Sequence, residues 1–274
     1  MVLHIHRATG EDSVVAEQQV NLVIQWLWCV FALSAVALAS GAHAPYGRYA
    51  ADWATLGGLR VPTVPGIVDW WGHSCSILSM GAVWLFASHA QCTASWVNIY
   101  ACLLFVAHYI NRGPLFALRV AQAKPIPVPT LLMTTGFVVL NGWLQGTTLL
   151  RVYVLEPETV WEPRFWLGNA LFFWGFYTNV SSDVALIALR KAPGPAYKIP
   201  RGGMFEYVSG ANFLGEIVEW IGFGLICGTP ASWTFAFTTV CNIGPRAIHH
   251  HQWYLDKFGS EYPKSRKALI PFIL

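Results

Sequence analysis

Long apolar runs, separated by short stretches rich in polar residues, proline and glycine, recur along the chain. They lie at 20–40, 67–88, 96–118, 128–150, 165–189, 209–228 and 230–245. A helix needs roughly 20 residues to cross the hydrocarbon core of a bilayer, and most of these runs are that long. The pattern therefore predicts an all-α fold: a polytopic integral membrane protein with seven transmembrane helices.

Few charged side chains interrupt this pattern. Hydrophobic residues make up 55% of the chain and charged residues 11%, whereas a soluble domain carries about 25% charged residues. The aromatic content of 15% excludes a disordered chain, because such chains lack large apolar side chains to bury. The net charge of +3 is far from the clustered basic surface of nucleic-acid-binding proteins, so no nucleic-acid partner is expected.

Lysine and arginine residues concentrate on one side of the predicted membrane. If the N-terminus lies outside, the first, third and fifth loops and the C-terminal segment are cytoplasmic. These regions contain all of the 17 lysines and arginines except Arg7, Arg151 and Arg164. Cytoplasmic loops are enriched in such residues, so we expect the N-terminus outside and the C-terminus in the cytoplasm.

Several classes of site lack their sequence signature. The six cysteines form no CxxC pair, which argues against a zinc site or a disulfide framework. The adjacent His249, His250 and His251 would point about 100° apart on a helix, so no metal site is expected. No Walker loop, GxGxxG, GxSxG or HExxH motif occurs, which leaves Rossmann, P-loop, serine-hydrolase and metalloprotease chemistry without support.

Two apolar runs carry polar residues at helical spacing. Asn212, Glu216 and Glu219 are spaced i, i+4, i+7 and share one helical face. Ionisable groups inside a membrane span are costly and are functional candidates by default. A polar clamp between helices and a cavity that holds a polar ligand both explain these three residues.

A similar face occurs in the run 165–189 and just beyond it. Asn179, Asp183 and Arg190 are four and then seven residues apart and end on the cytoplasmic side. A structural network explains them as well as a binding site does. Tyr109 and Arg112 are one turn apart near the end of the third run.

The C-terminal segment holds the densest polar cluster. Arg246, His250 and Tyr254 lie roughly along one side of a helix, and the tyrosine hydroxyl is a donor for a carbonyl. A lipid-facing basic anchor also explains the cations nearer the end of the chain. Polar groups thus collect at the cytoplasmic ends of the third, fifth and sixth runs, which fits an anionic ligand that enters from the cytoplasm.

The segment 197–274 reads as one long signature. It contains YKIPRGG at 197–203, YVSGANFLGE at 207–216, HHH at 249–251 and YPKSRKALIPF at 262–272. These motifs resemble those of the steroid 5α-reductases, or 3-oxo-5α-steroid 4-dehydrogenases. The resemblance is looser over about 105–190 and faint before that, where Tyr46-Gly47-Arg48 is its main anchor.

The resemblance implies an NADPH-dependent membrane enzyme that reduces the 4,5 double bond of 3-oxo-4-ene steroids such as progesterone and testosterone. Hydride goes to carbon 5, and carbon 4 is protonated. Tyr109 matches the family's ketone-polarising tyrosine. The family pairs it with a glutamate, and the matching stretch here contains Asp69, Trp70 and Trp71. Either Asp69 is a second, protonated donor or a tryptophan shapes the pocket.

For NADPH, the resemblance carries over polar residues from about 105–274. They are Arg112, Asn179, Asp183, Arg190, Tyr197, Asn212, Glu216, Arg246, His250 and Tyr254. Lys124 and Lys198 stand where the family has arginines. Lysine keeps the charge but lacks the bidentate fork, so looser phosphate discrimination is expected. Asn111 replaces a family histidine, which leaves that contact open.

A single membrane domain is expected for 1–274, with a polar N-terminal segment at 1–18 and a cytoplasmic C-terminal segment at 246–274. We expect a monomer, surrounded by membrane lipid, with its cofactor site facing the cytoplasm. The membrane is the cytoplasmic one in a prokaryote or the endoplasmic reticulum in a eukaryote. Three related activities stay open: an enoyl-thioester reductase, a sterol reductase and an isoprenylcysteine methyltransferase. A transporter or proton pathway through Glu216 and Glu219 is disfavoured by the absence of internal repeats.

Overall fold

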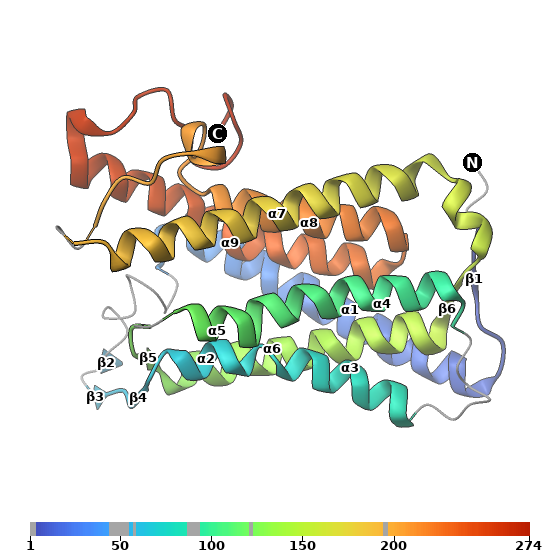
Figure 1. The fold of residues 1–274 in the computed structure, drawn as a ribbon. Helices are drawn as coiled ribbons and strands as arrows, with labels where there is room; N and C mark the ends of the chain where they lie inside the picture. The colour runs from blue at the N-terminus through green and yellow to red at the C-terminus, as the bar shows by residue number, and fades with distance from the viewer. Residues whose placement is uncertain (1–3, 44–54, 57–58, 87–93, 121–122, 194–196) are drawn as a thin grey trace.

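The helices run lengthwise through one bundle, with the N-terminus toward one end and the C-terminal segment at the other (Figure 1). The computed structural model describes residues 4–43, 55–56, 59–86, 94–120, 123–193 and 197–274. Tyr46-Gly47-Arg48, the N-terminal anchor of the family resemblance, lies outside the described residues.

Long helices dominate the described part of the chain, as predicted. The α-helices are α1 (Glu11–Ala39), α2 (Ile67–Gly72), α3 (Cys75–Phe86), α4 (Trp96–Ile110), α5 (Phe116–Arg119), α6 (Val128–Thr147), α7 (Pro163–Lys191), α8 (Ala211–Cys227) and α9 (Pro230–Phe258). Single π-helical turns follow two of them, at Asn111–Leu115 and Thr148–Val152. Short 3-10 turns lie at Pro157–Trp161, Gly203–Glu206 and Gly259–Glu261.

Short antiparallel strand pairs lie at the ends of the bundle. β1 (Ile5–Arg7) pairs with β6 (Tyr153–Leu155), β2 (Thr55–Leu56) with β3 (Leu59–Arg60), and β4 (Thr63–Val64) with β5 (Ile126–Pro127). The described residues form no larger sheet. The all-α class predicted from the sequence is therefore confirmed.

The run 67–88, expected as one helix, is interrupted, whereas the run 96–118 is one continuous helical stretch with a π-turn inside it. The run 67–88 is divided between α2 and α3. At the break, the His73 backbone N–H and the His73 ring nitrogen Nδ1 both lie near the Asp69 carbonyl oxygen, at 3.2 and 2.8 Å. The run 96–118 changes to a π-turn that contains Pro114, which lacks a backbone donor.

Two helices extend beyond the apolar runs that predicted them. α9 covers the run 230–245 and continues to Phe258, so Arg246, His250 and Tyr254 lie on one helix, as expected from the sequence. α1 begins at Glu11, inside the segment read as polar. Glu11 and Asp12 occupy its first turn, where acidic side chains interact favourably with the helix dipole.

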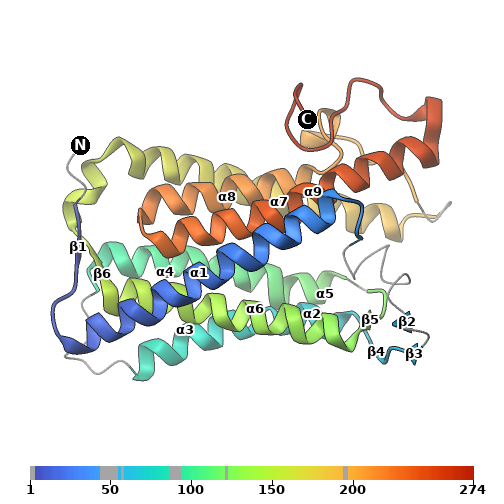
Figure 2. The same ribbon diagram turned by 180° about the vertical axis from the view of Figure 1, so that it is seen from behind.

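Two described helical stretches are long and apolar enough to cross a membrane by themselves: Glu11–Ala39 and Trp96–Arg119. α1 packs mainly on α9, where the Trp28 and Phe237 rings stack 3.9 Å apart. Its Leu22, Leu33 and Val36 side chains are exposed. An exposed apolar face of this kind is typical of contact with lipid. Figure 2 shows α1 crossing one side of the bundle.

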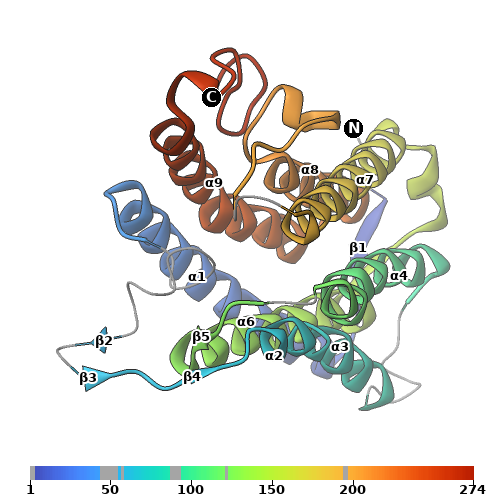
Figure 3. The same ribbon diagram turned by 60° about the vertical axis from the view of Figure 1, so that its left-hand side comes forward.

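Glycines bring α7 and α8 into backbone contact. A Cβ atom added to Gly175 would lie 2.4 Å from the Glu219 backbone nitrogen and 2.6 Å from the Gly215 carbonyl oxygen. Gly222 on α8 is equally close to the backbone of Phe172. Small residues permit this close approach between helices. Figure 3 shows the two helices side by side, with α9 next to α8.

Backbone pairing closes both ends of the bundle. At one end β1 pairs with β6, and the His4 backbone N–H donates to Glu162 Oε1 at 3.0 Å. At the other end, Val208 bridges Lys267, and the Gly210 backbone N–H donates to the Ala268 carbonyl at 3.0 Å. The C-terminal segment is thereby attached to the start of α8.

Gly175→Ala should lower stability by about 3 kcal/mol, because the added methyl group must push two backbones apart. The midpoint of heat unfolding in detergent measures this. Gly81→Ala is the matched control, since a Cβ atom added to Gly81 on α3 would have no other atom within 4 Å. Equal midpoints for the two variants would contradict the tight α7–α8 contact.

Candidate functional site

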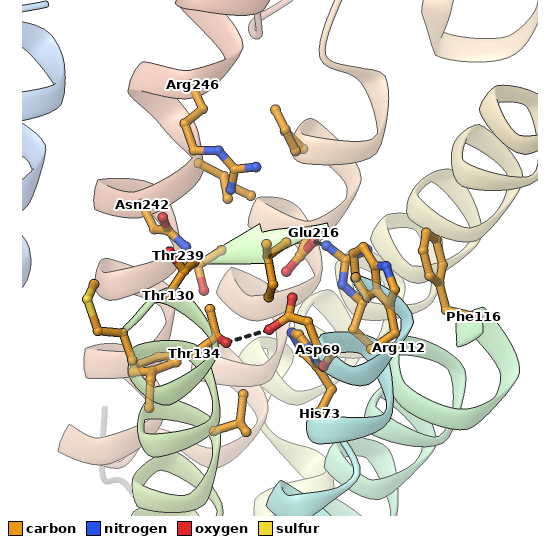
Figure 4. A pocket seen from close by; sticks show the side chains of 18 of the residues that line it. Asp69, His73, Arg112, Phe116, Thr130, Thr134, Glu216, Thr239, Asn242 and Arg246 are labelled. Atoms are coloured by element: carbon orange, nitrogen blue, oxygen red, sulfur yellow. Dashed lines mark hydrogen bonds and ion pairs between the residues drawn. The ribbon is translucent and has the colours of Figure 1, made fainter. Parts of the chain in front are cut away.

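One cavity of about 2110 Å³ runs between the helices. Side chains of all nine α-helices in the described part of the chain line it, together with the loops at the end where the C-terminal segment lies. Figure 4 shows part of its wall, with Arg246 lying across the opening from Asp69 and His73.

The cavity gathers all but one of the residues predicted for the site. Those that line it are Asp69, Tyr109, Arg112, Lys124, Asp183, Arg190, Tyr197, Lys198, Asn212, Glu216, Arg246, His250 and Tyr254. Asn179 does not line it and is fully buried behind the wall. Residues from distant parts of the sequence thus converge on one space.

Arg112 joins three helical elements at this wall. Its Nη1 lies 2.9 Å from Asp183 Oδ2 on α7, and its Nη2 lies 3.2 Å from Glu216 Oε2 on α8. The guanidinium also lies over the Trp70 ring at 5.2 Å and the Phe116 ring at 5.6 Å. Charge-assisted bonds to two carboxylates and stacking on aromatic rings suit arginine better than lysine.

Two asparagines donate hydrogen bonds to the same carboxylates. Asn212 Nδ2 donates to Asp183 Oδ1 at 3.0 Å. Asn179 Nδ2 donates to Glu216 Oε2 at 3.3 Å and to the Asn212 carbonyl at 2.9 Å. The two polar faces read from the sequence therefore form one network, in which Asn179 is a supporting residue.

Tyr109 is buried at the side of the cavity nearest α6. Its hydroxyl oxygen accepts a hydrogen bond of 3.3 Å from Asn141 Nδ2, and its ring lies 4.8 Å from the Phe105 ring. The π-turn begins two residues later. Such turns often occur at functional sites, because they reorient the side chains next to them.

Asp69 faces the cavity from α2. Its Oδ1 accepts a hydrogen bond from the Thr134 hydroxyl of α6, drawn as a dashed line in Figure 4. The ring of His73 stacks on Trp70 at 5.4 Å. Since Trp70 also lines the cavity and lies beneath Arg112, an acidic side chain and a tryptophan both shape this wall.

Five cationic side chains line the cavity toward the C-terminal end of the bundle: Lys124, Arg190, Lys191, Lys198 and Arg246. Lys124 Nζ lies 3.2 Å from the Tyr197 hydroxyl. Lys198 Nζ donates to the Ala192 and Pro193 carbonyls, at 3.0 and 2.6 Å. This concentration of positive charge is suited to an anionic group such as a phosphate.

Aromatic rings hold the residues of α9 at this end. The Arg246 guanidinium lies 5.1 Å from the Phe213 ring, and the His250 ring lies 5.3 Å from the same ring. Tyr254 stacks on Tyr262 of the C-terminal segment at 5.3 Å. The extension of α9 beyond residue 245 is what brings these side chains to the cavity.

Glu219 takes no part in the cavity lining. Its Oε1 lies 2.8 Å from His108 Nδ1, and both side chains are almost completely buried. The three residues of this face therefore have two different roles. Asn212 and Glu216 line the cavity, whereas Glu219 forms a polar clamp between α8 and α4, the other explanation that the sequence left open.

The other half of the cavity is apolar. Its wall consists of side chains from α1, α6 and α9, among them Leu27, Val30, Phe31, Phe137, Leu140, Trp143 and Phe235. A single space thus joins a cationic opening to an apolar interior. This shape fits one polar, anionic ligand and one lipophilic ligand that meet inside the protein.

Three polar residues around the predicted donors were not predicted from the sequence. They are His73, Thr134 and Asn141, which contact Asp69 or Tyr109. Asn141 and Gln145 are polar residues four apart in an apolar run, a signal that could have revealed them. Asn111, at the position of a family histidine, accepts from Arg119 Nη1 at 2.9 Å.

Comparison with known proteins gives a consistent result. The family model described as 3-oxo-5-alpha-steroid 4-dehydrogenase matches residues 124–274. The 3-oxo-5-alpha-steroid 4-dehydrogenase 1 of Bos taurus is 34% identical over 95% of the chain and 99% of its own length. The human protein of the same name is 35% identical over 97% of the chain and 98% of its own length. The 3-oxo-5-alpha-steroid 4-dehydrogenase 2 of Rattus norvegicus is 47% identical over 62% of the chain and 66% of its own length.

Arg112→Met should lower stability by about 3 kcal/mol, because Asp183 and Glu216 would face each other without their shared cation. Adding Asp183→Asn should restore part of the loss, which heat unfolding in detergent measures. Arg201→Met is the control: its ion pair with Glu206 is exposed and 3.9 Å long, so we expect less than about 1 kcal/mol. No recovery in the double variant would show that the network does not depend on charge balance.

Proposed function

Because the chain belongs to the 3-oxo-5α-steroid 4-dehydrogenase family, we propose that it reduces the 4,5 double bond of a 3-oxo-4-ene steroid with NADPH. The chain is an oxidoreductase that acts on CH–CH bonds. Substrates of the progesterone and testosterone type would give 5α-reduced products. The observation that carries the proposal is the single cavity that joins a cationic opening to an apolar interior beside Tyr109.

Family membership and the apolar helices indicate a membrane protein. In the proposed topology, α1, α6, α7, α8 and α9 each cross the membrane, α2 crosses together with α3, and α4 crosses together with α5. The N-terminus is then outside and the C-terminal segment is cytoplasmic. The cationic opening lies at the C-terminal end, so it faces the cytoplasm, where the cofactor is available.

An oxidoreductase of this family implies a nicotinamide cofactor. The residues present fit such a group, since cationic side chains from four segments, those of Arg190, Lys124, Lys198 and Arg246, line one end of a large cavity. These four would bind the phosphates. Tyr197, His250 and Tyr254 would contact the rest of the nucleotide. When bound, the cofactor supplies a hydride for carbon 5 of the steroid.

Tyr109 is the proposed electrophilic catalyst. Its hydroxyl donates to the 3-ketone and stabilises the enolate oxygen that develops during reduction. Asp69, when protonated, is a second donor to the same oxygen, and carbon 4 takes its proton from water. Donors of this kind are most effective in apolar surroundings of low dielectric constant, which the wall between α1, α6 and α9 provides.

The Arg112 network has a positioning role in this proposal. Arg112 Nη1 forms an ion pair with Asp183, and Nη2 forms one with Glu216. Arg112 therefore sets the position of the carboxylates, and Glu216 and Asn212 present their polar atoms to the nicotinamide end of the cofactor. A direct contact between Arg112 and the cofactor stays a prediction.

The proposed reaction is tested with purified protein in detergent, NADPH, and progesterone or testosterone. We expect an NADPH-dependent gain of two hydrogens with 5α configuration, identified by mass spectrometry against a standard. Tyr109→Phe should lower kcat roughly a hundredfold to a thousandfold, as the loss of one donor to a developing oxyanion does. Its affinity for NADPH should be unchanged.

Each result discriminates between activities. NADPH binding without a steroid product would point to a different enone or an enoyl thioester. An absence of NADPH binding would contradict the proposal and favour a methyltransferase of the wider superfamily, which binds S-adenosylmethionine. Unchanged turnover of Tyr109→Phe would remove the tyrosine from the mechanism.

Lys124→Ala should weaken NADPH binding about tenfold and NADH binding much less, if Lys124 contacts the additional phosphate of NADPH. The ratio of the two dissociation constants is the measurement. Lys257→Ala is the control, because Lys257 is an exposed cation of α9 that does not line the cavity. Equal losses for the two cofactors would place Lys124 away from that phosphate.

A further inference from the structure

We infer that Asn141 is a positioning residue that fixes the direction of the Tyr109 hydroxyl. Asn141 has no place among the residues predicted for the site, and it does not line the cavity. The inference rests on the proposed function, because it concerns how Tyr109 is prepared to donate to a ketone. In this inference, two amide side chains of α6 determine the direction in which the Tyr109 hydroxyl donates its hydrogen bond.

The chain of hydrogen bonds begins at the backbone of α9. Gln145 Nε2 donates to the Ala231 carbonyl oxygen at 3.0 Å. The same nitrogen donates to Asn141 Oδ1 at 3.2 Å. Asn141 Nδ2 then donates to the Tyr109 hydroxyl oxygen at 3.3 Å. All four residues are buried, with exposed fractions between 0% and 3%.

The direction of this chain follows from its first acceptor. A carbonyl oxygen only accepts, so Gln145 must turn its NH₂ group toward Ala231. The second hydrogen of that group faces Asn141, which must therefore present its oxygen. Rotating the Gln145 amide by 180° would place its Oε1 against the Ala231 carbonyl oxygen, and two acceptors cannot form a hydrogen bond. In the observed orientation, Gln145 Oε1 has no partner among the described residues.

The consequence reaches the Tyr109 hydroxyl. An amide nitrogen only donates, so the Tyr109 oxygen is the acceptor toward α6, and its hydrogen must point elsewhere. The buried Ser76 hydroxyl lies near the same oxygen, but a hydroxyl both donates and accepts and imposes no direction. The amide chain does impose one: it excludes α6 as acceptor of the Tyr109 proton, which leaves Ser76 Oγ, a weakly bound acceptor with no other partner among the described residues, and a ligand in the cavity.

This arrangement suits the proposed chemistry. A donor that already points at the developing oxyanion does not have to reorganise during the reaction. A tyrosine that donated to a protein acceptor would first have to break that bond. The two amides thus act through Tyr109 and need not touch the substrate.

The test uses Asn141→Asp, in which a carboxylate of nearly the same shape replaces the amide. At alkaline pH the ionised carboxylate accepts the Tyr109 proton and reverses the hydrogen bond, while Gln145 still donates to its other oxygen. We expect kcat to fall roughly tenfold to a hundredfold, with KM for the steroid changed much less. Asn141→Leu removes the donor without reversing the bond and should lose less activity.

A spectroscopic measurement separates direction from structure. The probe is a 5α-reduced 3-oxo steroid labelled with ¹³C at carbon 3, bound to the enzyme loaded with oxidised cofactor. A hydrogen bond from Tyr109 lowers the infrared stretching frequency of the ketone, and Tyr109→Phe should raise it. Asn141→Asp should raise it toward the Tyr109→Phe value. Thr147→Val is the control, because Thr147 is a buried α6 residue whose hydroxyl has no partner among the described residues.

The outcomes distinguish the inference from the proposed function. If Tyr109→Phe raises the frequency and Asn141→Asp does not, the inference is overturned and the role of Tyr109 stands. If the wild-type enzyme neither reduces the steroid nor shows a frequency that depends on Tyr109, the proposed function fails and the inference fails with it. Should Asn141→Asp not fold, Gln145→Met provides the same test by removing the donor that orients Asn141.

Discussion

The Arg112 guanidinium, held between carboxylates on α7 and α8, is the interaction on which the cavity wall depends. A charge buried between helices is tolerated when it is paired with opposite charges that are themselves hydrogen-bonded. Here Asn179 and Asn212 bond the same carboxylates. The network therefore orders three elements together, and it places its polar atoms where the cavity changes from apolar to cationic.

The rest of the protein supports this arrangement from outside. The glycine contact keeps α7 and α8 close enough for Asn179 to reach the Asn212 carbonyl. The π-turn after α4 brings Arg112 to the same wall. At the open end, the C-terminal segment pairs with residues 207–210 and so holds the beginning of α8. The position of the polar site inside the apolar bundle thus depends on the packing of the helices around it.

The sequence predicted the helices well and their interruptions poorly, for a physical reason. Apolar runs follow directly from the need to bury side chains in lipid or protein. The break at His73 and Ser74, between α2 and α3, is instead a local change of backbone hydrogen bonding inside one apolar run. Asn179, Asp183, Asn212 and Glu216 could be recognised because polar side chains are unusual in an apolar run, whereas Lys124, Tyr197 and Lys198 were expected only from the family resemblance. The partners of the site residues could not be recognised, since the meeting of Asn141 with Tyr109 depends on how α6 packs against α4.

The backbone contact between α7 and α8 also limits how the chain can change in length. One residue inserted within α7 would rotate everything beyond it by about 100° and shift it by about 1.5 Å. Asn179 and Asp183 would then leave their partners on α8, while the glycines could no longer face one another. Insertions and deletions are therefore excluded from these helices and have to be absorbed by the loops. Length variation among homologous sequences would mark, residue by residue, where this frame ends.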